Sequence, residues 1–431
     1  MATQQRRAVI TGLGIFSPIG MDADSFWKSI VEGRSGIRPI KHMDVSEFPC
    51  RIAGDVPEFT DKFAREIFKH NRDHAKSLKM MARTVQLGVS VAQTAMVNSG
   101  IAKSGVDPTR VAVEFGAAIV HTEIEDIARA SKIATNCQPG AIDMKIWGEK
   151  SLEEIPPLWM LKYLPNMPAC HVSIMHDIQG PSNTITVGDA SSVLALGEAF
   201  RIMQRNLVDF VLVGGTESKI NPLNFVRQML FQPVTPSHND SPATAVRPFD
   251  RDRDGMVLGE GAAAFGIEEL EHARKRNATI FAEVCGFASG FDRDRQGKTL
   301  ARVIRKALAD AGITPADVDH INAHGMGTQE SDRWEANAIR EVFGQSVPVW
   351  GLKGFFGALG PASGVIEMLG SILALRHGVL PPMLNCENPD PELNLNVHSR
   401  ESRAIQKPYV VKINFSDLGQ VGAIVLRRWD S

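Results

Sequence analysis

The sequence predicts an α/β fold built from two similar βαβ-type halves. Strongly apolar segments, such as residues 111–120 and 209–217, run without polar alternation into turns of glycine or other small residues, which is typical of buried parallel strands. A helix, a turn containing proline and an apolar strand also occur in the same order once in each half of the chain. The helix after residue 190 carries small and apolar residues, which predicts a buried helix.

Composition indicates a globular protein and excludes several classes. With 431 residues, 43% of them hydrophobic, the chain can form one large domain or two ordinary ones. A net charge of -2 creates no field that would attract nucleic acid or anionic lipid, and no apolar stretch has the length of a membrane span. The amino end runs directly into a strand rather than into a signal-peptide core. We therefore expect a cytoplasmic protein without nucleic-acid or membrane partners.

The five cysteines are widely scattered, and none belongs to a Cys-x-x-Cys pair. We expect reduced and mostly buried thiols, with no metal and no cofactor. None of them stands on a Gly-flanked turn before a helix, so cysteine chemistry has no obvious place in this chain. The residues are Cys50, Cys137, Cys170, Cys285 and Cys386.

The first predicted strand, residues 7–14, ends in Gly12 and Gly14 and is followed by a helix that carries Phe26 and Trp27. Gly-x-Gly after a strand is a weak sign of dinucleotide binding. No third glycine opens the helix, and no acidic residue ends a second strand about 20 residues later. We therefore do not predict a dinucleotide site.

A helix over residues 78–97 and the strand at 111–120 form the first copy of the repeat, and a helix over 300–308 with a strand at 318–322 forms the second. Residues 121–175 are the least regular segment, with two tryptophans and five prolines. A long excursion of this kind inside a compact domain usually covers a pocket or makes a subunit contact.

The central motif of the chain extends from residue 180 to residue 203. Residues 184–187 are mostly β-branched and end at Gly188, and from Ser191 onward apolar residues fall at helical spacing, which predicts a strand, a sharp turn and a helix. The turn places Asp189 at a helix amino end, where free N–H groups and the macrodipole favour negative charge. Many enzymes hold a nucleophile at such a position.

Two motifs resemble those of the β-ketoacyl-acyl-carrier-protein synthases, ketosynthase II-like members of the thiolase superfamily. Gly180-Pro181, the β-branched strand and the helix with Gly197-Glu198-Ala199 are similar to their nucleophile elbow. Residues 247–262 contain Arg-Pro-Phe-Asp, Arg-Asp-Gly and Gly-Glu-Gly-Ala, which is similar to the most specific signature of that family. The resemblance implies the thiolase fold, a five-layered αβαβα structure, with an N-terminal half at residues 1–270 and a C-terminal half at residues 271–431.

The resemblance also assigns the catalytic positions. Condensing ketosynthases use a cysteine thiolate, two histidines and a Gly-Phe-Gly-Gly loop. The family cysteine falls on Asp189. His324, followed by Asp332 and Glu335, matches the first histidine motif, and a strand ending just before His324 would place it where ligand sites of α/β sheets gather.

The remaining positions depart from the family pattern in part. Lys353 matches, but the second histidine is replaced by Ala358, whose methyl group donates no hydrogen bond. In the loop near the carboxyl end Phe415 and Gly419 match, while the second family phenylalanine falls on Asp417. Glycines allow the turn that aims backbone N–H groups at an oxyanion. The side chains that replace the family glycines here restrict that turn. We expect this loop to be reshaped.

These replacements predict a chain that cannot carry out ordinary condensation. The first hypothesis is a chain-length-factor-like partner of an active ketosynthase in fatty acid or polyketide biosynthesis. The alternative is a homodimeric enzyme that hydrolyses, decarboxylates or transfers acyl thioesters with His324, Asp189 and Asp417. Both imply acyl carrier protein and an acyl thioester as partners, and a homodimer or heterodimer. Asp189 itself is either a helix cap or one of a pair of carboxylates working as acid and base.

Overall fold

The computed structural model describes residues 6–430. Residues 1–5, part of the amino end from which no signal peptide was expected, and residue 431 lie outside this range. The ten main strands are β1 (Ala8–Phe16), β4 (Val111–Gly116), β5 (Ser182–Ile185), β6 (Phe210–Ser218), β7 (Glu260–Glu269), β8 (Ala282–Phe291), β9 (Val318–Asn322), β10 (Val349–Trp350), β13 (Tyr409–Phe415) and β14 (Gln420–Arg428). They form one sheet in the order β10-β9-β13-β14-β8-β1-β7-β6-β4-β5.

The strand order shows the predicted repeat directly. Outward from β1 come β7, β6, β4 and β5, and outward from β8 come β14, β13, β9 and β10. In each half the first two pairings are antiparallel and the next two are parallel. β1 and β8 join the halves by a short antiparallel ladder from Ala8–Val284 to Ile10–Ala282. The prediction of two similar halves is therefore confirmed.

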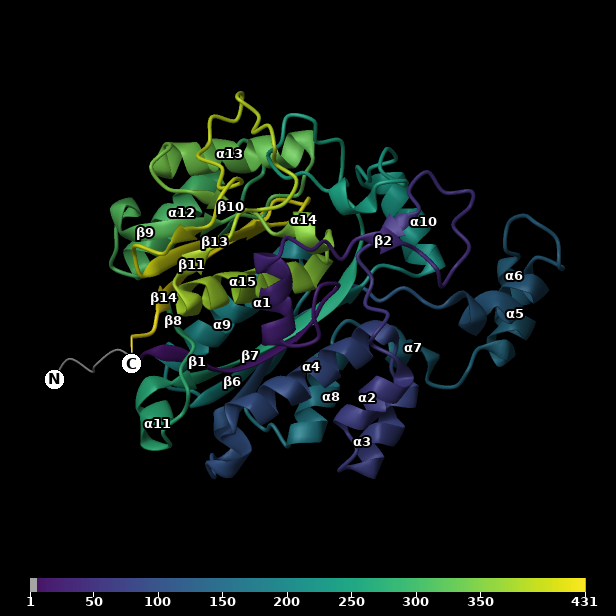
Figure 1. Ribbon diagram of the computed structural model, residues 1–431. Coiled ribbons are helices and arrows are strands. Elements are labelled where there is room, and N and C mark those ends of the chain that lie inside the picture. Colours follow the sequence, from purple (N-terminus) through teal and green to yellow (C-terminus); the bar gives the residue numbers. More distant parts are fainter. Residues whose placement is uncertain (1–5, 431) are drawn as a thin grey trace.

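The helices complete a five-layered αβαβα arrangement, as predicted. Helices α9 (Ser191–Gln204) and α15 (Ser363–His377) lie in the centre and contact strands of both halves. Helices α4 (Arg83–Ser99) and α8 (Met167–His176) cover the first half, and α12 (Lys298–Asp310) and α13 (Gln329–Phe343) cover the second. Figure 1 shows α12 and α13 on one side of the molecule and α4 and α8 on the other.

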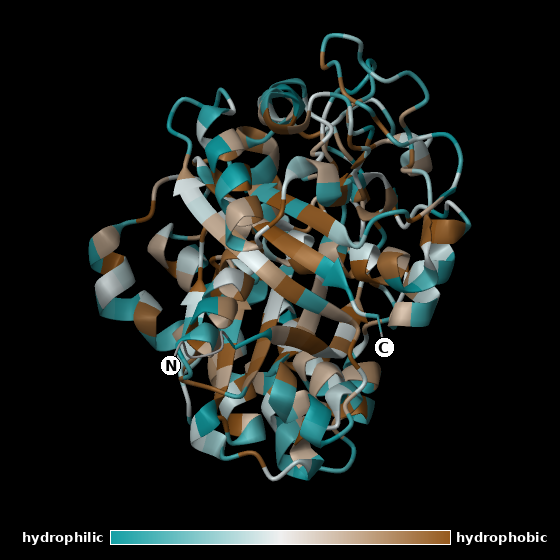
Figure 2. Ribbon diagram, turned by 90° about the vertical axis from the view of Figure 1, so that its left-hand side faces the viewer, coloured by the Kyte–Doolittle hydropathy of each residue, from teal (hydrophilic) through white to brown (hydrophobic). Residues whose placement is uncertain are grey.

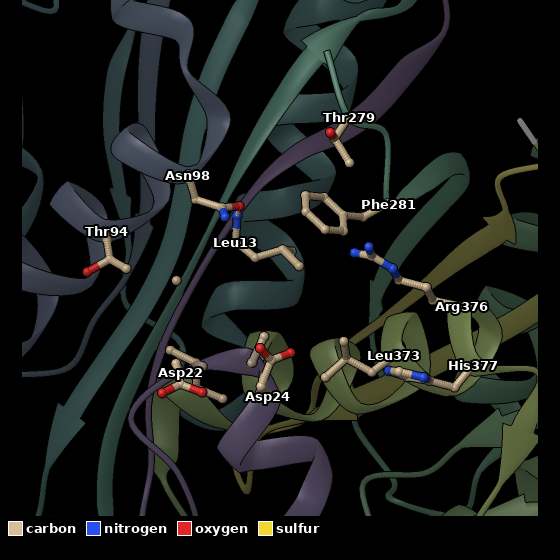
Figure 3. Close-up of a pocket in the computed structure, with 13 residues that line it drawn as sticks. Leu13, Asp22, Asp24, Thr94, Asn98, Thr279, Phe281, Leu373, Arg376 and His377 are labelled. Carbon is tan, nitrogen blue, oxygen red and sulfur yellow. Dashed lines mark hydrogen bonds between the residues drawn. The ribbon is translucent and has the colours of Figure 1, made fainter.

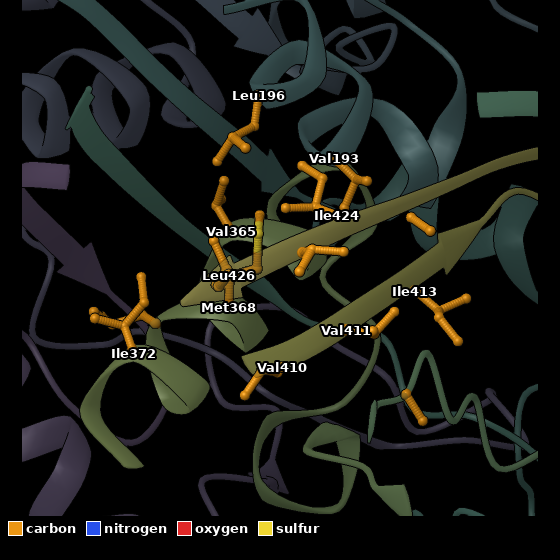
Figure 4. Packing of buried hydrophobic residues seen from close by; sticks show 14 of the residues in the cluster. Val193, Leu196, Val365, Met368, Ile372, Val410, Val411, Ile413, Ile424 and Leu426 are labelled. Carbon is orange, nitrogen blue, oxygen red and sulfur yellow. The ribbon is translucent and has the colours of Figure 1, made fainter. Parts of the chain in front are cut away.

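The central layer is apolar because each of its faces packs against one half of the sheet. Every residue of α15 from Ser363 to Leu375 is buried. In Figure 2, hydrophobic residues are frequent on the strands, and hydrophilic residues are frequent on the outer helices and loops. Figure 4 shows the packing of α9, α15, β13 and β14 through Val193, Leu196, Val365, Met368, Ile372, Val410, Val411, Ile413, Ile424 and Leu426.

The remaining elements lie around this body. Within residues 121–175, predicted as irregular, short helices alternate with turns, and α5 and α6 project from the molecule (Figure 1). The other helices are α1 (Ala23–Val31), α2 (Asp61–Ile67), α3 (Arg72–Ser77), α5 (Ile124–Ala134), α6 (Met144–Ile146), α7 (Trp159–Tyr163), α10 (Pro222–Phe231), α11 (Leu270–Lys275) and α14 (Lys353–Phe356). The short strands are β2 (Arg38–Pro39), β3 (Ile52–Ala53), β11 (Val379–Leu380) and β12 (Arg403–Ala404).

The predicted helix at residues 78–97 begins later than expected, at Arg83, because Met81 and Ala82 are extended. We propose that the two halves divide at residue 270, where α11 begins. Among the described residues, no helix has the length and apolar character needed to cross a membrane.

Candidate active site

Asp189 lies in a one-turn 3₁₀ helix, Gly188–Ala190, that leads into α9. Gly188 has a φ of +61°, which glycine adopts at no steric cost. The Ser191 hydroxyl donates to the Gly188 carbonyl (2.6 Å) and accepts from the Val187 N–H (2.9 Å), which holds the turn. The strand–turn–helix prediction is thus confirmed, and the Asp189 side chain is only 7% exposed.

The surroundings of Asp189 do not support a helix cap. Within residues 6–430 no backbone N–H donates to its carboxylate, and neither the turn nor α9 has a side-chain cap. Instead, Oδ1 accepts a long hydrogen bond from the Ser363 hydroxyl (3.4 Å), at the start of α15. The amino ends of both central helices therefore meet beside Asp189, where their dipoles favour a negative charge.

His324 follows β9 at the carboxyl edge of the sheet and is buried. Its loop is held by two acids of α13. Glu335 accepts the N–H groups of His324 (2.6 Å) and Gly325 (2.8 Å). Asp332 accepts those of Gly327 (3.0 Å) and Phe249 (2.8 Å). Both predicted acids therefore position the loop through its backbone.

The ring of His324 is held as a neutral hydrogen-bond donor. Its Nδ1 lies 3.2 Å from Lys353 Nζ and 3.1 Å from Asn414 Nδ2. Since both neighbours are donors, Nδ1 accepts and the ring proton resides on Nε2. Burial, followed by the charges of Lys353 and Lys412, lowers the pKa of His324 well below its usual value. Phe415 packs on the ring at a centroid distance of 4.3 Å.

Asn414 connects His324 to the elbow. The same Nδ2 that contacts His324 donates to the backbone carbonyl of Asp189 (3.1 Å). Asn414 lies on β13, so its position relative to the elbow depends on the sheet and not on the local sequence. The sequence analysis missed this residue.

A buried ionic cluster supports the same histidine. Lys353 Nζ donates to the His324 carbonyl (2.6 Å) and to Glu367 Oε1 (2.5 Å). Lys412 pairs with the other oxygen of Glu367 and donates to Asn322 Oδ1 (3.0 Å). Burial is the main cause that lowers the pKa of Lys412 to about 8. Lys412 was also missed, although a lysine inside the apolar strand Val-Val-Lys-Ile was a signal of a buried charge.

Ala358 presents only a methyl group to its surroundings. Its N–H donates to the Val257 carbonyl (2.8 Å), and its own carbonyl accepts from Gly259 (3.1 Å). The side chain is buried in an apolar cluster that includes Met256 and Met326. At this position no side-chain donor reaches the site.

Asp417 lies in the turn between β13 and β14, where Gly419 has a φ of +103°. The Asp417 side chain lines a cavity of about 440 Å³ together with Gln232, Arg295 and Met326. Burial and the charge of Asp189 raise its pKa. No hydrogen bond among residues 6–430 links Asp417 to His324, so it stands at the edge of the site and influences Asp189 through charge.

Two further charged residues stand at the carboxyl end of β6: Glu217, on which the charge of Asp189 acts, and Lys219, which follows the strand. A side chain added at Gly360 would begin 2.9 Å from Lys219 Cε and 3.2 Å from Glu217 Cγ, so both pack over this glycine. Burial raises the pKa of Glu217 to about 7, with the charge of Lys219 lowering it and that of Asp189 raising it further. The sequence analysis missed both residues, although charged residues at the carboxyl end of a buried strand are a signal of a ligand site.

A separate cavity of about 450 Å³ contains none of the predicted site residues (Figure 3). Its basic groups already have aromatic partners, because Arg376 lies over Phe281 (5.0 Å) and His377 stacks on Trp27 (4.9 Å). In the described part of the chain, no group of three or more His, Cys, Asp or Glu residues is arranged to hold a metal ion.

Comparison with known proteins agrees with the fold and with the motifs. Residues 5–273 match the beta-ketoacyl synthase N-terminal domain and residues 281–387 match the C-terminal domain. The chain is 33% identical to 3-oxoacyl-acyl-carrier-protein synthase 2 of Coxiella burnetii, covering 99% of each protein. It is 32% identical to the tetracenomycin polyketide synthase ketoacyl synthase alpha subunit of Streptomyces glaucescens, covering 98% of this chain and 97% of the relative.

A solved structure, the ishigamide ketosynthase/chain length factor, superimposes with a TM-score of 0.85 at 26% identity, covering 99% of this chain and 100% of the other. Both domain models match in the expected order, and together they extend over most of the sequence. The chain therefore belongs to the β-ketoacyl synthase family, the ketosynthases of fatty acid and polyketide biosynthesis.

Proposed function

We propose that this protein is a non-condensing ketosynthase-like subunit that pairs with an active ketosynthase in the manner of a chain length factor. The observation that carries this proposal is Asp189, which occupies the elbow where the resemblance places a nucleophilic cysteine. Attack of a carboxylate on a thioester would give a reactive mixed anhydride rather than a stable acyl-enzyme. Asp189 is therefore a poor substitute for the thiolate.

The wall of the site supports the same proposal. Ala358, at the position of the second family histidine, lies in an apolar cluster and offers no hydrogen. Loss of one positioned donor of this kind typically lowers the rate by a factor of about 10² to 10³. The loss of both the thiolate and a donor makes condensation by this chain improbable on energetic grounds.

The pairing surface that we propose is the edge strand β5. It ends the ten-stranded sheet, and Ser182 and Asn183 are exposed. The N–H of Thr184 donates only to the side chain of the preceding Asn183 (2.9 Å), so it points away from β4. An unpaired strand edge is a template for a strand of another chain. Because β5 leads into the elbow, a partner bound there would lie close to Asp189.

Exposed apolar side chains near this edge and on residues 121–175 favour a partner as well. Large hydrophobic residues that face solvent in contiguous regions usually mark interaction sites. These residues are Ile119, Ile124, Ile142, Met144, Leu152, Leu158, Met160, Leu161 and Ile174.

A second candidate function is a homodimeric enzyme that hydrolyses, decarboxylates or transfers an acyl thioester. It is favoured by the neutral Nε2–H donor of His324 together with an acid, Glu217, whose pKa of about 7 suits proton transfer. Asp189 and Asp417 would contribute the remaining charge. In both functions we propose acyl carrier protein and an acyl thioester as partners, and a cytoplasmic location.

The deciding experiment measures the mass of the protein by light scattering after size-exclusion chromatography, alone and after co-expression with an active ketosynthase. A stable heterodimer supports the first function, and a homodimer that converts acyl-carrier-protein thioesters supports the second. A monomer at micromolar concentration in both preparations would contradict both.

A further inference from the structure

Glu114 is a buried carboxylate without a hydrogen-bond partner. It stands in the middle of β4, flanked in sequence by Val113 and Phe115, and it is only 1% exposed. Within residues 6–430 neither of its oxygens makes a hydrogen bond or an ion pair, and Oε2 is fully enclosed by protein. Buried polar side chains are nearly always paired, so an orphaned carboxylate inside a sheet needs an explanation.

The side chain of Glu114 lies on the face of β4 that packs against α9, close to the edge of the sheet. Successive residues of a strand point to opposite faces, so Glu114 shares a face with Gly116. A Cβ added at Gly116 would lie 2.5 Å from the backbone nitrogen of Ser192, at the start of α9. In the parallel ladder, Asn183 of the edge strand β5 lies directly opposite Glu114 and is exposed. Glu114 is therefore one strand away from the edge where we expect a partner.

The described part of this chain does not supply a base for Glu114. Its acidic neighbour on α9, Glu198, has Arg205 at 3.8 Å, whereas Glu114 has no such ion pair within residues 6–430. Burial, followed by the charge of Glu198, raises the pKa of Glu114 to about 8, so the isolated subunit holds a neutral acid at neutral pH. The edge strand Ser182–Ile185 contains no basic residue. A second copy paired along β5 would bring the same uncharged strand and another Glu114.

We propose that Glu114 receives a Lys or Arg side chain that the partner subunit presents at the β5 edge, and that this ion pair selects an active ketosynthase over a second copy of this chain. The identity of the partner as a ketosynthase rests on the proposed function. A strand added to β5 would stand two strand spacings, roughly 9.6 Å, from β4. A glutamate and a long basic side chain together span this distance, because the basic group is carried on a flexible stem of several carbons.

The ion pair would act as a device of specificity. In the mixed complex Glu114 is ionised and paired, whereas a pairing of two copies along β5 leaves two buried carboxyl groups without a base from either edge strand. Removal of the carboxylate should therefore affect the two assemblies in opposite directions.

The test uses full-length protein and an active ketosynthase that co-purifies with the wild type. The fluorescently labelled ketosynthase is titrated with each variant, and self-association of each variant is measured separately by sedimentation velocity. Glu114→Leu removes the carboxylate and keeps an apolar side chain of similar size. We expect it to weaken the mixed complex about 30-fold or more, as for removal of one member of a buried charge pair. We expect it to strengthen self-association about threefold or more, because an unpaired buried carboxyl group is lost.

Glu198→Gln is the matched control, because Glu198 lies on the helix that packs against β4 but has an ion-pair partner in its own chain. Exposed ion pairs contribute little, so we expect either dissociation constant to change less than about fivefold. Urea denaturation checks that each variant is folded. If Glu114→Leu does not fold, Glu114→Gln takes its place, since it keeps the shape of the side chain and removes the charge.

A purely structural role of Glu114 would weaken both assemblies together, and that result would overturn the inference. A mixed complex of unchanged affinity after Glu114→Leu would also overturn it, while the proposed function would stand. If the wild type binds no ketosynthase, the proposed function fails. The inference then fails as well unless Glu114→Leu strengthens self-association, so the two failures are distinguishable.

Discussion

Glu217 is expected to make the stability of the protein depend on pH. Burial raises its pKa from 4.5 to about 7 in the folded protein. Because the folded protein binds the Glu217 proton more tightly than the unfolded chain does, protonation of Glu217 contributes to the free energy of unfolding. This contribution is fully present below pH 4.5 and is lost as pH rises through about 7. The complete shift corresponds to about 3 kcal/mol, at 1.36 kcal/mol for each pKa unit. Between pH 5 and pH 8 the part that is lost is about 2 to 3 kcal/mol.

The substitution Glu217→Gln isolates this contribution, because the amide resembles the protonated acid and does not titrate. Other groups change protonation in the same range, so the informative quantity is the difference in unfolding free energy between variant and wild type at each pH. We expect that difference to shift in favour of the variant by about 2 to 3 kcal/mol from pH 5 to pH 8. Urea denaturation at one fixed protein concentration measures it.

The control for this experiment is Glu153→Gln, at an exposed position in the segment between α6 and α7. Its difference from wild type should change little between the two pH values. If Glu217→Gln behaves like the control, Glu217 is ionised in the folded state at neutral pH. The proposed proton-transfer role beside Asp189 would then lose its physical basis.

Three further predictions concern the site and the pairing edge. The unmodified protein should not condense malonyl and acyl carrier-protein thioesters, and Asp189→Cys with Ala358→His should restore partial acylation at most; turnover that survives blockade of all cysteines would contradict this. Asn414→Ala removes one of two donors to Nδ1 of His324, so ¹⁵N spectra of the ring should show a larger share of the Nδ1–H tautomer; an unchanged spectrum would mean that the other donor suffices. Thr184→Pro removes an outward N–H of β5 without touching the β4 ladder, and it should weaken dimer formation at least tenfold while the melting temperature of the monomer stays similar.

The sequence alone determined the fold class and the location of the elbow. Both rest on local patterns: apolar strands ending in small residues, helical spacing after Ser191, and a repeated order of helix, turn and strand. Such patterns follow from the periodicity of each element and need no knowledge of its neighbours. They sufficed to place Asp189 on a turn before a helix and His324 at the end of a strand.

Only the tertiary structure decided what surrounds those residues. Glu217 lies near the end of β6, Lys219 follows that strand, and Asn414 lies on β13. Glu217 lies near Asp189 within the first half, whereas Asn414 reaches Asp189 from the second half because the two halves face each other across α9 and α15. No local pattern encodes the distances between strands. These distances decide whether a carboxylate caps a helix or accepts a hydrogen bond from the Ser363 hydroxyl, and whether a buried lysine has a partner.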